Sequence, residues 1–304
     1  MSLRPLDPGR DLPTVAALLT LGGVERLEAW ELEEELARLA PPKVMLRWVA
    51  GEGATVAGTA WLVRYPSQHR VLHVGVVVEQ AARRRGLGAA LWRAVEAAAA
   101  GEEGVDELRA QVREDAADGR LVAERMGFAT IAHAVTATLD LSGWEPDAHV
   151  MDVAGIRFLS FADTGEGEDD LRRLYALNRI AALDDPAPGD SFPEYASWLR
   201  IVVESQSFRP EGQLLALDGA EWVGLSTVTV AGQVASTGIT GVVRSHRGRG
   251  VALALKAHAC AHAKRSGARM VETEMNAANA AMRAINRRLG FVEQPGYLTL
   301  TRPI

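Results

Sequence analysis

The chain has 304 residues, about the length of two average domains, and its 48% hydrophobic and 24% charged residues are typical of a soluble globular protein. Its 33 basic and 39 acidic side chains give a formal net charge of −6, which argues against a nucleic-acid partner. No apolar run approaches the ~20 residues of a membrane span, the first residues lack a secretory apolar core, and the single Cys260 excludes an internal disulfide or a cysteine-cluster metal site. We therefore expect a cytoplasmic protein with no membrane partner and no metal.

The predicted elements of the first half alternate between strands and helices. Residues 2–6 are predicted to form a strand, and Asp11 is a plausible N-cap for a helix over 12–21. The apolar run 71–78 is typical of a central strand covered on both faces, and it leads into a turn rich in arginine and glycine. The remaining elements are a helix at 25–39, a hairpin of strands 44–50 and 55–63, helices at 89–100 and 119–126, and strands at 107–112 and 134–141.

The second half repeats this order with one irregular insertion. Residues 183–192 contain three acidic residues and two prolines and cannot form a regular element. Gly290 is expected to end the last helix in the C-cap position. Strands are predicted at 156–161, 214–217, 223–230, 270–275 and 297–301, and helices at 171–182, 193–204, 252–265 and 276–291.

Each half contains a strand that ends in a turn rich in arginine and glycine at the start of a helix. The two turns are Arg83-x-x-Gly86-x-Gly88 and Arg247-x-x-Gly250-x-Ala252. A turn of this kind leaves backbone N–H groups unpaired at the positive end of a helix dipole, and glycine lets a ligand oxygen approach the backbone closely. The pattern therefore predicts an anion site that suits a pyrophosphate.

The spacing of the turns indicates a tandem repeat. Gly88 precedes Gly127-Phe128 by 39 positions, and Ala252 precedes Gly290-Phe291 by 38. Corresponding positions of the two turns lie 164 residues apart. Because self-similarity at a fixed period marks repeated domains, we predict two domains, 1–145 and 150–304.

The two turns resemble the acetyl-CoA pyrophosphate loop, Q/R-x-x-G-x-G/A, of the GNAT superfamily of N-acetyltransferases. The two Gly-Phe pairs resemble the L-G-F that closes the last helix of that family, and the tandem organisation is distantly similar to that of mycothiol synthase. The resemblance covers both halves and implies two α/β domains of GNAT type, each a mixed, mostly antiparallel twisted sheet flanked by helices. It also implies acetyl-CoA as the co-substrate.

The resemblance places the pantetheine arm of acetyl-CoA in a gap where the strand before each loop parts from the next strand. Val242 or Val243 in the second repeat, and Val77 or Val78 in the first, would offer the backbone N–H that polarises the thioester carbonyl. Asn279, at a helix start, is a candidate contact to the arm, although capping also explains an asparagine there. The loop residues implied in phosphate binding are Arg244, Arg247, Gly248, Arg249, Gly250, Val251 and Ala252, with Arg83, Arg84, Arg85, Gly86, Leu87 and Gly88 in the first repeat.

The sequence departs from the family at the position of a frequent catalytic tyrosine, four residues before the glycine of Gly-Phe. Asn286 stands there in the second repeat, and an amide cannot give up a proton near neutral pH. The candidate bases are Glu272 and Glu274, which share one face of a strand, Asp184 and Asp185 in the irregular insertion, and His246. A solvated acidic pair and a helix-ending turn are the structural alternatives for these residues.

The leading hypothesis is an acetyl-CoA-dependent N-acetyltransferase in which a small-molecule amine attacks the thioester directly, with the second repeat as the catalyst. The alternative is an acyl-CoA-binding sensor without transferase activity. A monomer and a homodimer are both compatible with the sequence. No acidic residue lies between Glu221 and Glu272, so we expect the arginines of the second loop to be free for phosphates.

Overall fold

The computed structural model describes residues 2–21, 32, 45–52, 55–65, 68–146, 152–184, 192–205 and 207–304. The chain forms two compact units. The N-terminal unit comprises residues 1–132 together with 297–304, and the C-terminal unit comprises residues 133–296. The predicted helix at 25–39 lies outside the described residues except for position 32.

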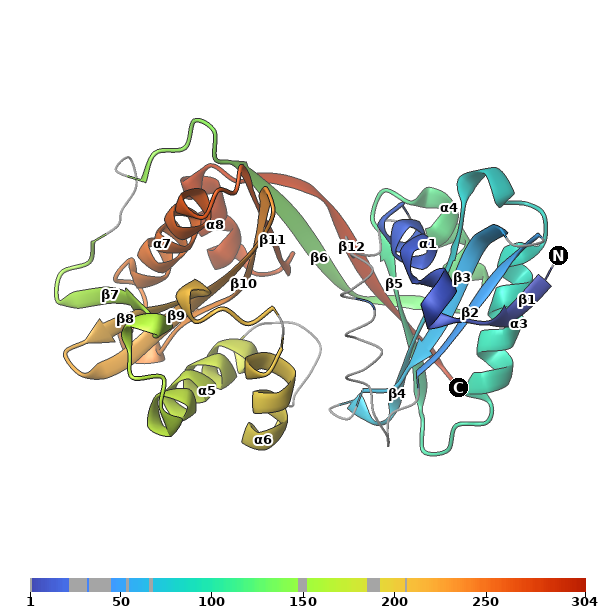
Figure 1. The fold of residues 1–304 in the computed structure, drawn as a ribbon, viewed down its shortest axis with the longest axis horizontal. Coiled ribbons are helices and arrows are strands. Elements are labelled where there is room, and N and C mark those ends of the chain that lie inside the picture. Colours follow the sequence, from blue (N-terminus) through green and yellow to red (C-terminus); the bar gives the residue numbers. More distant parts are fainter. Residues whose placement is uncertain are drawn as a thin grey trace. The chain divides into compact units, whose positions relative to one another are not determined.

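The N-terminal unit is a six-stranded sheet flanked by helices (Figure 1). Its strand order is β1-β2-β3-β4-β5-β12, in which β4 and β5 are parallel and the other neighbouring strands are antiparallel. The elements are β1 (Ser2–Pro5), α1 (Pro8–Leu21), β2 (Met45–Glu52), β3 (Thr55–Val63), β4 (Val71–Val78), α3 (Leu87–Ala99), β5 (Glu107–Arg113), α4 (Ala117–Arg125) and the end of β12 (Val292–Pro303).

The C-terminal unit repeats this plan with the order β6-β11-β10-β9-β8-β7, in which β10 and β11 are parallel. The mixed, mostly antiparallel α/β architecture predicted for both repeats is therefore confirmed. The elements are β6 (Ala129–Asp140), β7 (Ile156–Ser160), α5 (Glu168–Leu183), α6 (Tyr195–Trp198), β8 (Gln213–Asp218), β9 (Glu221–Ala231), β10 (Val234–Val242), α7 (Val251–Arg265), β11 (Met270–Asn276) and α8 (Ala280–Leu289). A π-helix, Leu199–Val203, continues α6.

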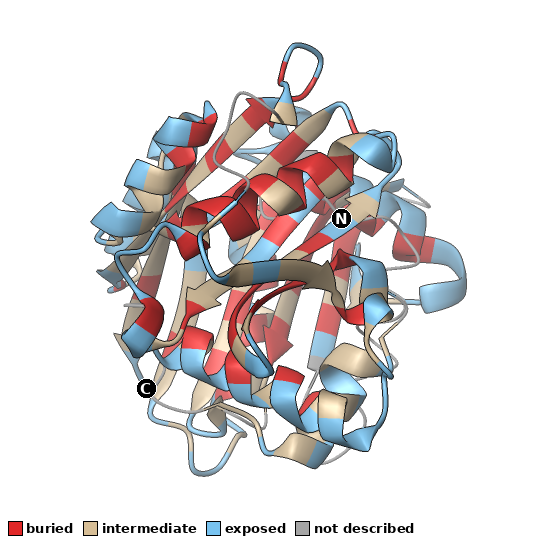
Figure 2. Cartoon of the chain, turned by 90° about the vertical axis from the view of Figure 1, so that its left-hand side faces the viewer, coloured by how far each residue is buried: buried red, intermediate tan, exposed pale blue. Residues whose placement is uncertain are grey.

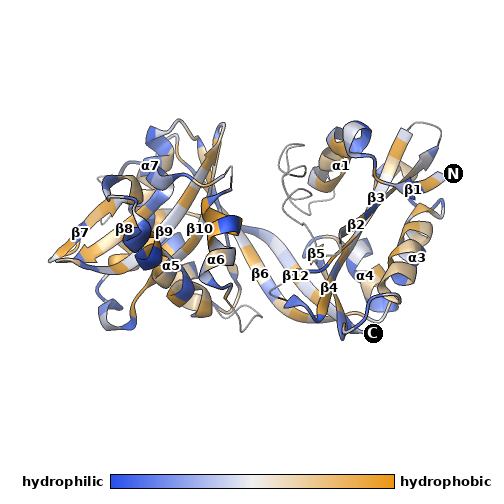
Figure 3. Cartoon of the chain, turned by 60° about the horizontal axis from the view of Figure 1, so that its bottom comes forward, coloured by the Kyte–Doolittle hydropathy of each residue, from blue (hydrophilic) through white to orange (hydrophobic). Residues whose placement is uncertain are grey.

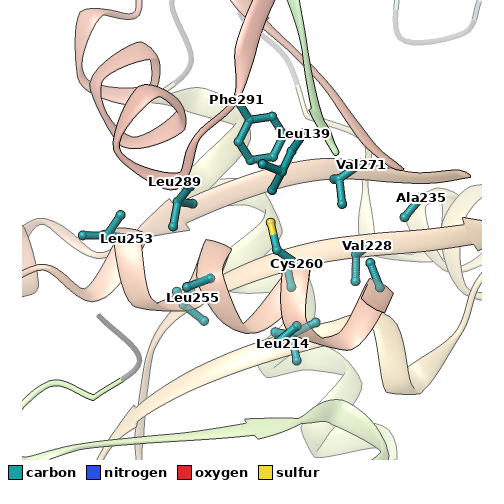
Figure 4. Close-up of a cluster of buried hydrophobic side chains, with 14 of the residues drawn as sticks. Leu139, Leu214, Val228, Ala235, Leu253, Leu255, Cys260, Val271, Leu289 and Phe291 are labelled. Carbon is teal, nitrogen blue, oxygen red and sulfur yellow. The ribbon is translucent and has the colours of Figure 1, made fainter. Parts of the chain in front are cut away.

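In the core of the C-terminal unit, helix α7 packs against the sheet. Ten residues of α7 are buried, and buried residues are red in Figure 2. Cys260 lies among Leu139, Val271 and Phe291 (Figure 4), and burial raises the pKa of its thiol to about 12. Cys260 is therefore a core residue and not a nucleophile.

Hydrophobic residues also run along β8 and β9 (Figure 3), and positions 214–217 of β8 are buried.

In two helices whose starts differ from the predicted ones, a side chain accepts hydrogen bonds from groups close to it in the chain. Asp11 lies inside the first turns of α1 and not at its N-cap, because its buried carboxylate accepts hydrogen bonds from the Arg4 side chain and the Asp7 backbone N–H. The last helix, α8, begins at Ala280 and not at 276, and the Asn279 side chain caps it by accepting from the Met282 N–H at 3.1 Å. Gly290 ends α8 with a φ of 93°, as predicted.

The last strand of each repeat pairs within the other compact unit. Strand β6 of the first repeat pairs with β11, placing Val135 opposite Met275, and β12 of the second repeat pairs with β5, placing Leu298 opposite Val112. The two strands are equivalent, since they begin and end 163 residues apart. The compact units therefore differ from the predicted sequential division into 1–145 and 150–304, which follows the order of the repeats along the chain.

Candidate active site

Strands β10 and β11 pair over four residues only, from Val234 opposite Met270 to Thr237 opposite Thr273. The register of β10 on β9 shifts between Thr237 and Thr240, so β10 turns away from β11 at this point. A cleft of about 590 Å³ is lined by both strands beyond it and by α7 and α8. In the N-terminal unit, β4 and β5 stop pairing at His73 and Arg109, the equivalent positions 164 residues earlier. The two strands thus part at the same place in both repeats.

The backbone amides at the end of β10 face alternate sides. Val243 donates its N–H to Val223 O of β9 at 2.9 Å, so the Val242 N–H points the other way, towards β11 and the cleft. In the N-terminal unit, Glu79 donates to Ala57 O at 2.8 Å, which turns the Val78 N–H away from β3. Of each predicted pair, Val242 and Val78 present an N–H to the gap, whereas Val243 and Val77 direct theirs to the neighbouring antiparallel strand.

In both loops, an arginine side chain donates a hydrogen bond to the strand that precedes the loop. Arg247 Nε donates to Val242 O at 2.9 Å, and Arg83 Nε donates to Val78 O at 3.1 Å. Gly250 and Gly86 start the following helices in the left-handed region, with φ values of 86° and 84°. The first arginine of the motif therefore has a structural role in both repeats, and the loop backbone reaches a conformation that favours glycine.

The arginines of the second loop have acidic partners from distant parts of the chain. Asp184, at the end of α5, forms an ion pair with Arg247 and lies 3.4 Å from Arg244, and Asp218 lies 3.6 Å from Arg249. Desolvation raises the pKa of the Asp184 carboxyl, but the hydrogen bonds and charges of Arg247 and Arg244 outweigh it and lower that pKa below its usual value. The expectation of an unpaired arginine cluster is therefore wrong, because the partners are close only in the folded chain.

Some of the residues predicted to bind phosphate line the cleft. Arg247, Gly248, Gly250, Val251, Ala252 and Asn279 line it together with Val242, whereas Val243, Arg244 and Arg249 are not among its described lining residues. Arg249 instead donates to Ala154 O at 3.3 Å. The lining residues lie at the end of β10 and the starts of α7 and α8, so strand end, loop and two helix N-termini converge on one hollow.

Of the predicted catalytic residues on β11 and α8, only Glu274 is among the described lining residues of the cleft. Along β11, Val271, Thr273 and Met275 are buried, and Glu272 and Glu274 lie on the opposite face. Glu274 lines the cleft, and desolvation raises the pKa of its carboxyl, whereas Glu272 is not among the described lining residues. Asn286 is buried on α8 and donates to Met275 Sδ at 3.0 Å, which directs it into the core. Asp185 lies outside the described residues.

Sequence reasoning missed Lys256, a buried lysine that lines the cleft from α7. Its Nζ donates to Thr273 Oγ1 at 3.1 Å, and burial lowers the pKa of the amine to about 8. The available signal was a lysine within the apolar run Leu253-Ala-Leu-Lys-Ala257, in a chain with three lysines.

The N-terminal unit keeps the loop but changes the groups around the gap. Trp92 occupies the position of Lys256 and contacts Phe128, while Arg302 lies over both rings. At α4 the N-cap is Ala116, where α8 has Asn279. Burial lowers the pKa of His73 to about 4, which leaves the imidazole neutral near pH 7. The polar groups that line the cleft of the C-terminal unit are thus replaced by apolar ones at these two positions.

Comparison with known proteins agrees with this geometry. The model of the acetyltransferase (GNAT) family matches residues 16–128 and 170–291. The chain belongs to the acetyltransferase (GNAT) family. It contains two copies of the family domain, in agreement with the predicted tandem form. No curated protein matches the chain, and no helix among the described residues is long and apolar enough to cross a membrane.

Solved structures show the same tandem fold. A GCN5-related N-acetyltransferase from Sphaerobacter thermophilus has a TM-score of 0.77 and 22% identity, over 99% of this chain and 95% of the other. A tandem GNAT protein from the clavulanic acid biosynthesis pathway has a TM-score of 0.76 and 23% identity, over 99% and 98% of the two chains. A putative acetyltransferase from Pyrococcus horikoshii has a TM-score of 0.59 and 14% identity, over 100% and 89%.

Proposed function

We propose that this GNAT protein transfers the acetyl group of acetyl-CoA to a small-molecule amine, and that its second repeat carries the reaction. The observation behind this proposal is the cleft of the C-terminal unit. In it, the Val242 N–H, the loop at the start of α7 and the Glu274 carboxylate line one continuous hollow. These groups supply the functions that acetyl transfer requires, namely phosphate binding, carbonyl polarisation and proton acceptance.

The residues present suit acetyl-CoA by their chemistry. The N–H groups at the start of α7 provide an anion site for a pyrophosphate. The gap between β10 and β11 leaves the Val242 N–H without a partner strand, so an extended arm with amide groups can pair there as a strand would. The same N–H, or one deeper in the gap, would polarise the thioester carbonyl.

Glu274 is the group we assign as the proton acceptor for the amine. Its carboxyl faces the cleft, and its raised pKa makes it a stronger base than an ordinary glutamate. Asp184, the other carboxylate that lines the cleft, is held by Arg247 and Arg244 and has a lowered pKa, which weakens it as a base. The substrate ammonium therefore gives a proton to Glu274, directly or through a water molecule, and the neutral amine attacks the thioester.

An acyl-CoA sensor is the second candidate function, and the position of Asn286 favours it. At the site of the family's frequent tyrosine, Asn286 is buried and bonded to Met275, so no acid stands there. A sensor would bind acetyl-CoA without releasing CoA in the presence of amines.

A matched pair of charge substitutions tests the division between the repeats. Ala252→Glu and Gly88→Glu introduce a carboxylate at equivalent positions in the first turn of α7 and α3, where the helix dipole tolerates an acid but a phosphate is repelled. We expect Ala252→Glu to abolish acetyl-CoA binding and CoA release across a panel of primary amines, and Gly88→Glu to preserve both. The reverse result would assign the reaction to the first repeat, and binding without release would favour the sensor.

A further inference from the structure

Lys256 is a buried cation within a hollow that a substrate would fill. It projects from α7, and the residue is 1% exposed. Its Nζ lies 3.1 Å from Thr273 Oγ1, 3.8 Å from Met282 Sδ and 5.3 Å from the centre of the Phe291 ring. Strand β11, helix α8 and Phe291 after α8 thus surround the amine.

No carboxylate forms an ion pair with Lys256 in the described part of the chain. Cys260 lies near it on its own helix, and the charged or titratable residues that line the same cleft are Glu274 on β11, Arg288 on α8, Asp184 at the end of α5, and His246 and Arg247 before α7. Strand β10 contributes none, since it reads Val-Ala-Ser-Thr-Gly-Ile-Thr-Gly-Val. A buried ammonium without a counter-charge is costly, and it stabilises any group that becomes negative beside it.

The amine lies at the closed end of the gap. Thr273, its hydrogen-bond partner, is the last residue of β11 that pairs with β10. Side chains alternate along β11, so Lys256 and Glu274 are on opposite faces of the strand. The gap therefore has the Glu274 carboxylate on one face and the Lys256 ammonium on the other. The first can accept a proton, and the second can stabilise an anion.

We infer that Lys256 is the acid of the transfer reaction and acts on the sulfur that leaves from acetyl-CoA, which extends the proposed function and rests on it. The neutral amine nitrogen forms a bond to the acetyl carbon and releases a proton to water, the carbon–sulfur bond breaks, and its electron pair stays on sulfur. The ammonium of Lys256 stabilises this thiolate and gives it a proton, forming the CoA thiol. Neutral Lys256 regains a proton from water after CoA departs. The acid of this site thus comes from α7, in place of the missing tyrosine on α8.

The ionisation of bound CoA tests this role without an acceptor amine. The thiolate of CoA absorbs in the ultraviolet, so a titration of the complex reports the thiol pKa, with desulfo-CoA as the blank. We expect the thiol pKa of CoA to be lower by about one to two units in the parent complex than in the Lys256→Met complex, because an opposite charge nearby favours the thiolate. Lys264→Met, on the exposed end of the same helix, should leave the parent value unchanged.

Kinetics with a primary amine that supports CoA release add a second readout. Lys256→Met should lower kcat roughly 100-fold while the KM for acetyl-CoA changes less than about threefold. Melting curves check that the variant is folded, and Lys256→Gln serves as a second neutral replacement if the methionine variant is not. Equal thiol pKa values in parent and folded variants, or an unchanged kcat, would overturn the assignment of Lys256 and leave the proposed function standing. Failure of the parent to bind CoA would overturn both.

Discussion

At the scale of single residues, desolvation in the cleft moves two ionisable groups towards neutrality from opposite directions. Desolvation disfavours the charged form of any group, so the partial desolvation of Glu274, which keeps some exposed surface, raises the pKa of its carboxyl, and the burial of Lys256 lowers the pKa of its amine to about 8. Both groups line the hollow, on opposite faces of β11. Perturbed groups of opposite type in one cleft are typical of catalytic sites that need an acid and a base near neutral pH.

The role of Glu274 can be checked by its pH dependence. Glu274 accepts a proton only when ionised, so activity should rise with pH through its pKa, and this rise should lie at higher pH than for an ordinary glutamate because the pKa is raised. We expect Glu274→Gln to lower kcat/KM for the amine roughly 100-fold and to remove that rise. The pH–rate profile of CoA release is the measurement.

Glu272→Gln provides the matched control, because Glu272 shares a face of β11 with Glu274 but is not among the described lining residues of the cleft. It should retain parent kinetics. An unchanged profile in Glu274→Gln would transfer the role of base to another group.

At the scale of elements, the two loops have the same backbone conformation at the second position of the motif, although the residues there differ. The second position of the motif has a positive φ in both repeats, 61° at Arg84 and 75° at Gly248. In the left-handed region of backbone conformation, a residue with a side chain is about 1–2 kcal/mol less stable than glycine. The first loop therefore carries backbone strain that the second loop avoids.

Relief of this strain is measurable as stability. We expect Arg84→Gly to raise the free energy of unfolding by about 1 kcal/mol, after allowing for the greater chain entropy of glycine in the unfolded state. Gly248→Ala should lower it by a similar amount, although a Cβ at Gly248 would meet no atom within 4 Å. Denaturant titration of each variant is the test, and a loss of stability in Arg84→Gly would show that the Arg84 side chain makes a compensating contact.

At the scale of the whole molecule, the repeats exchange their last strands. Leu300, in the second repeat, is buried in the same core cluster as Leu72, Leu91 and Leu108 of the N-terminal unit. Leu139, in the first repeat, is buried with Val271 and Phe291 of the C-terminal unit. Each compact unit thus needs residues from both repeats to complete its hydrophobic core.

This exchange predicts where a core substitution acts. Leu300→Ala should cost about 2–4 kcal/mol and speed hydrogen exchange in β4, β5 and α3 of the N-terminal unit. Leu139→Ala should instead speed exchange in β10, β11 and α7. Hydrogen-exchange mass spectrometry distinguishes the two patterns. Loss of protection confined to β10, β11 and α7 in Leu300→Ala would show that β12 does not complete the N-terminal unit.

The sequence by itself determined what depends on local pattern. Period-two and helical spacing placed most strands and helices within a few residues, and the spacing of Arg83–Gly88 and Arg247–Ala252 identified the repeat and both loops. Local chemistry also predicted Gly290 as a C-cap, since a left-handed residue after a helix favours glycine. These features are decided by residues near one another in the chain.

Only the tertiary structure decided what depends on distant neighbours. It paired Asp184 with Arg247, some 60 residues away, and so removed the expected free cluster of arginines. It placed Glu274, but not Glu272, on the described lining of the cleft, because β11 stops pairing with β10 at Thr273, and it turned Asn286 into the core against Met275. It placed Lys256 beside Thr273 and exchanged β6 with β12. Strand β12 pairs with β5 across almost 200 residues of chain, so no local pattern determines that pairing.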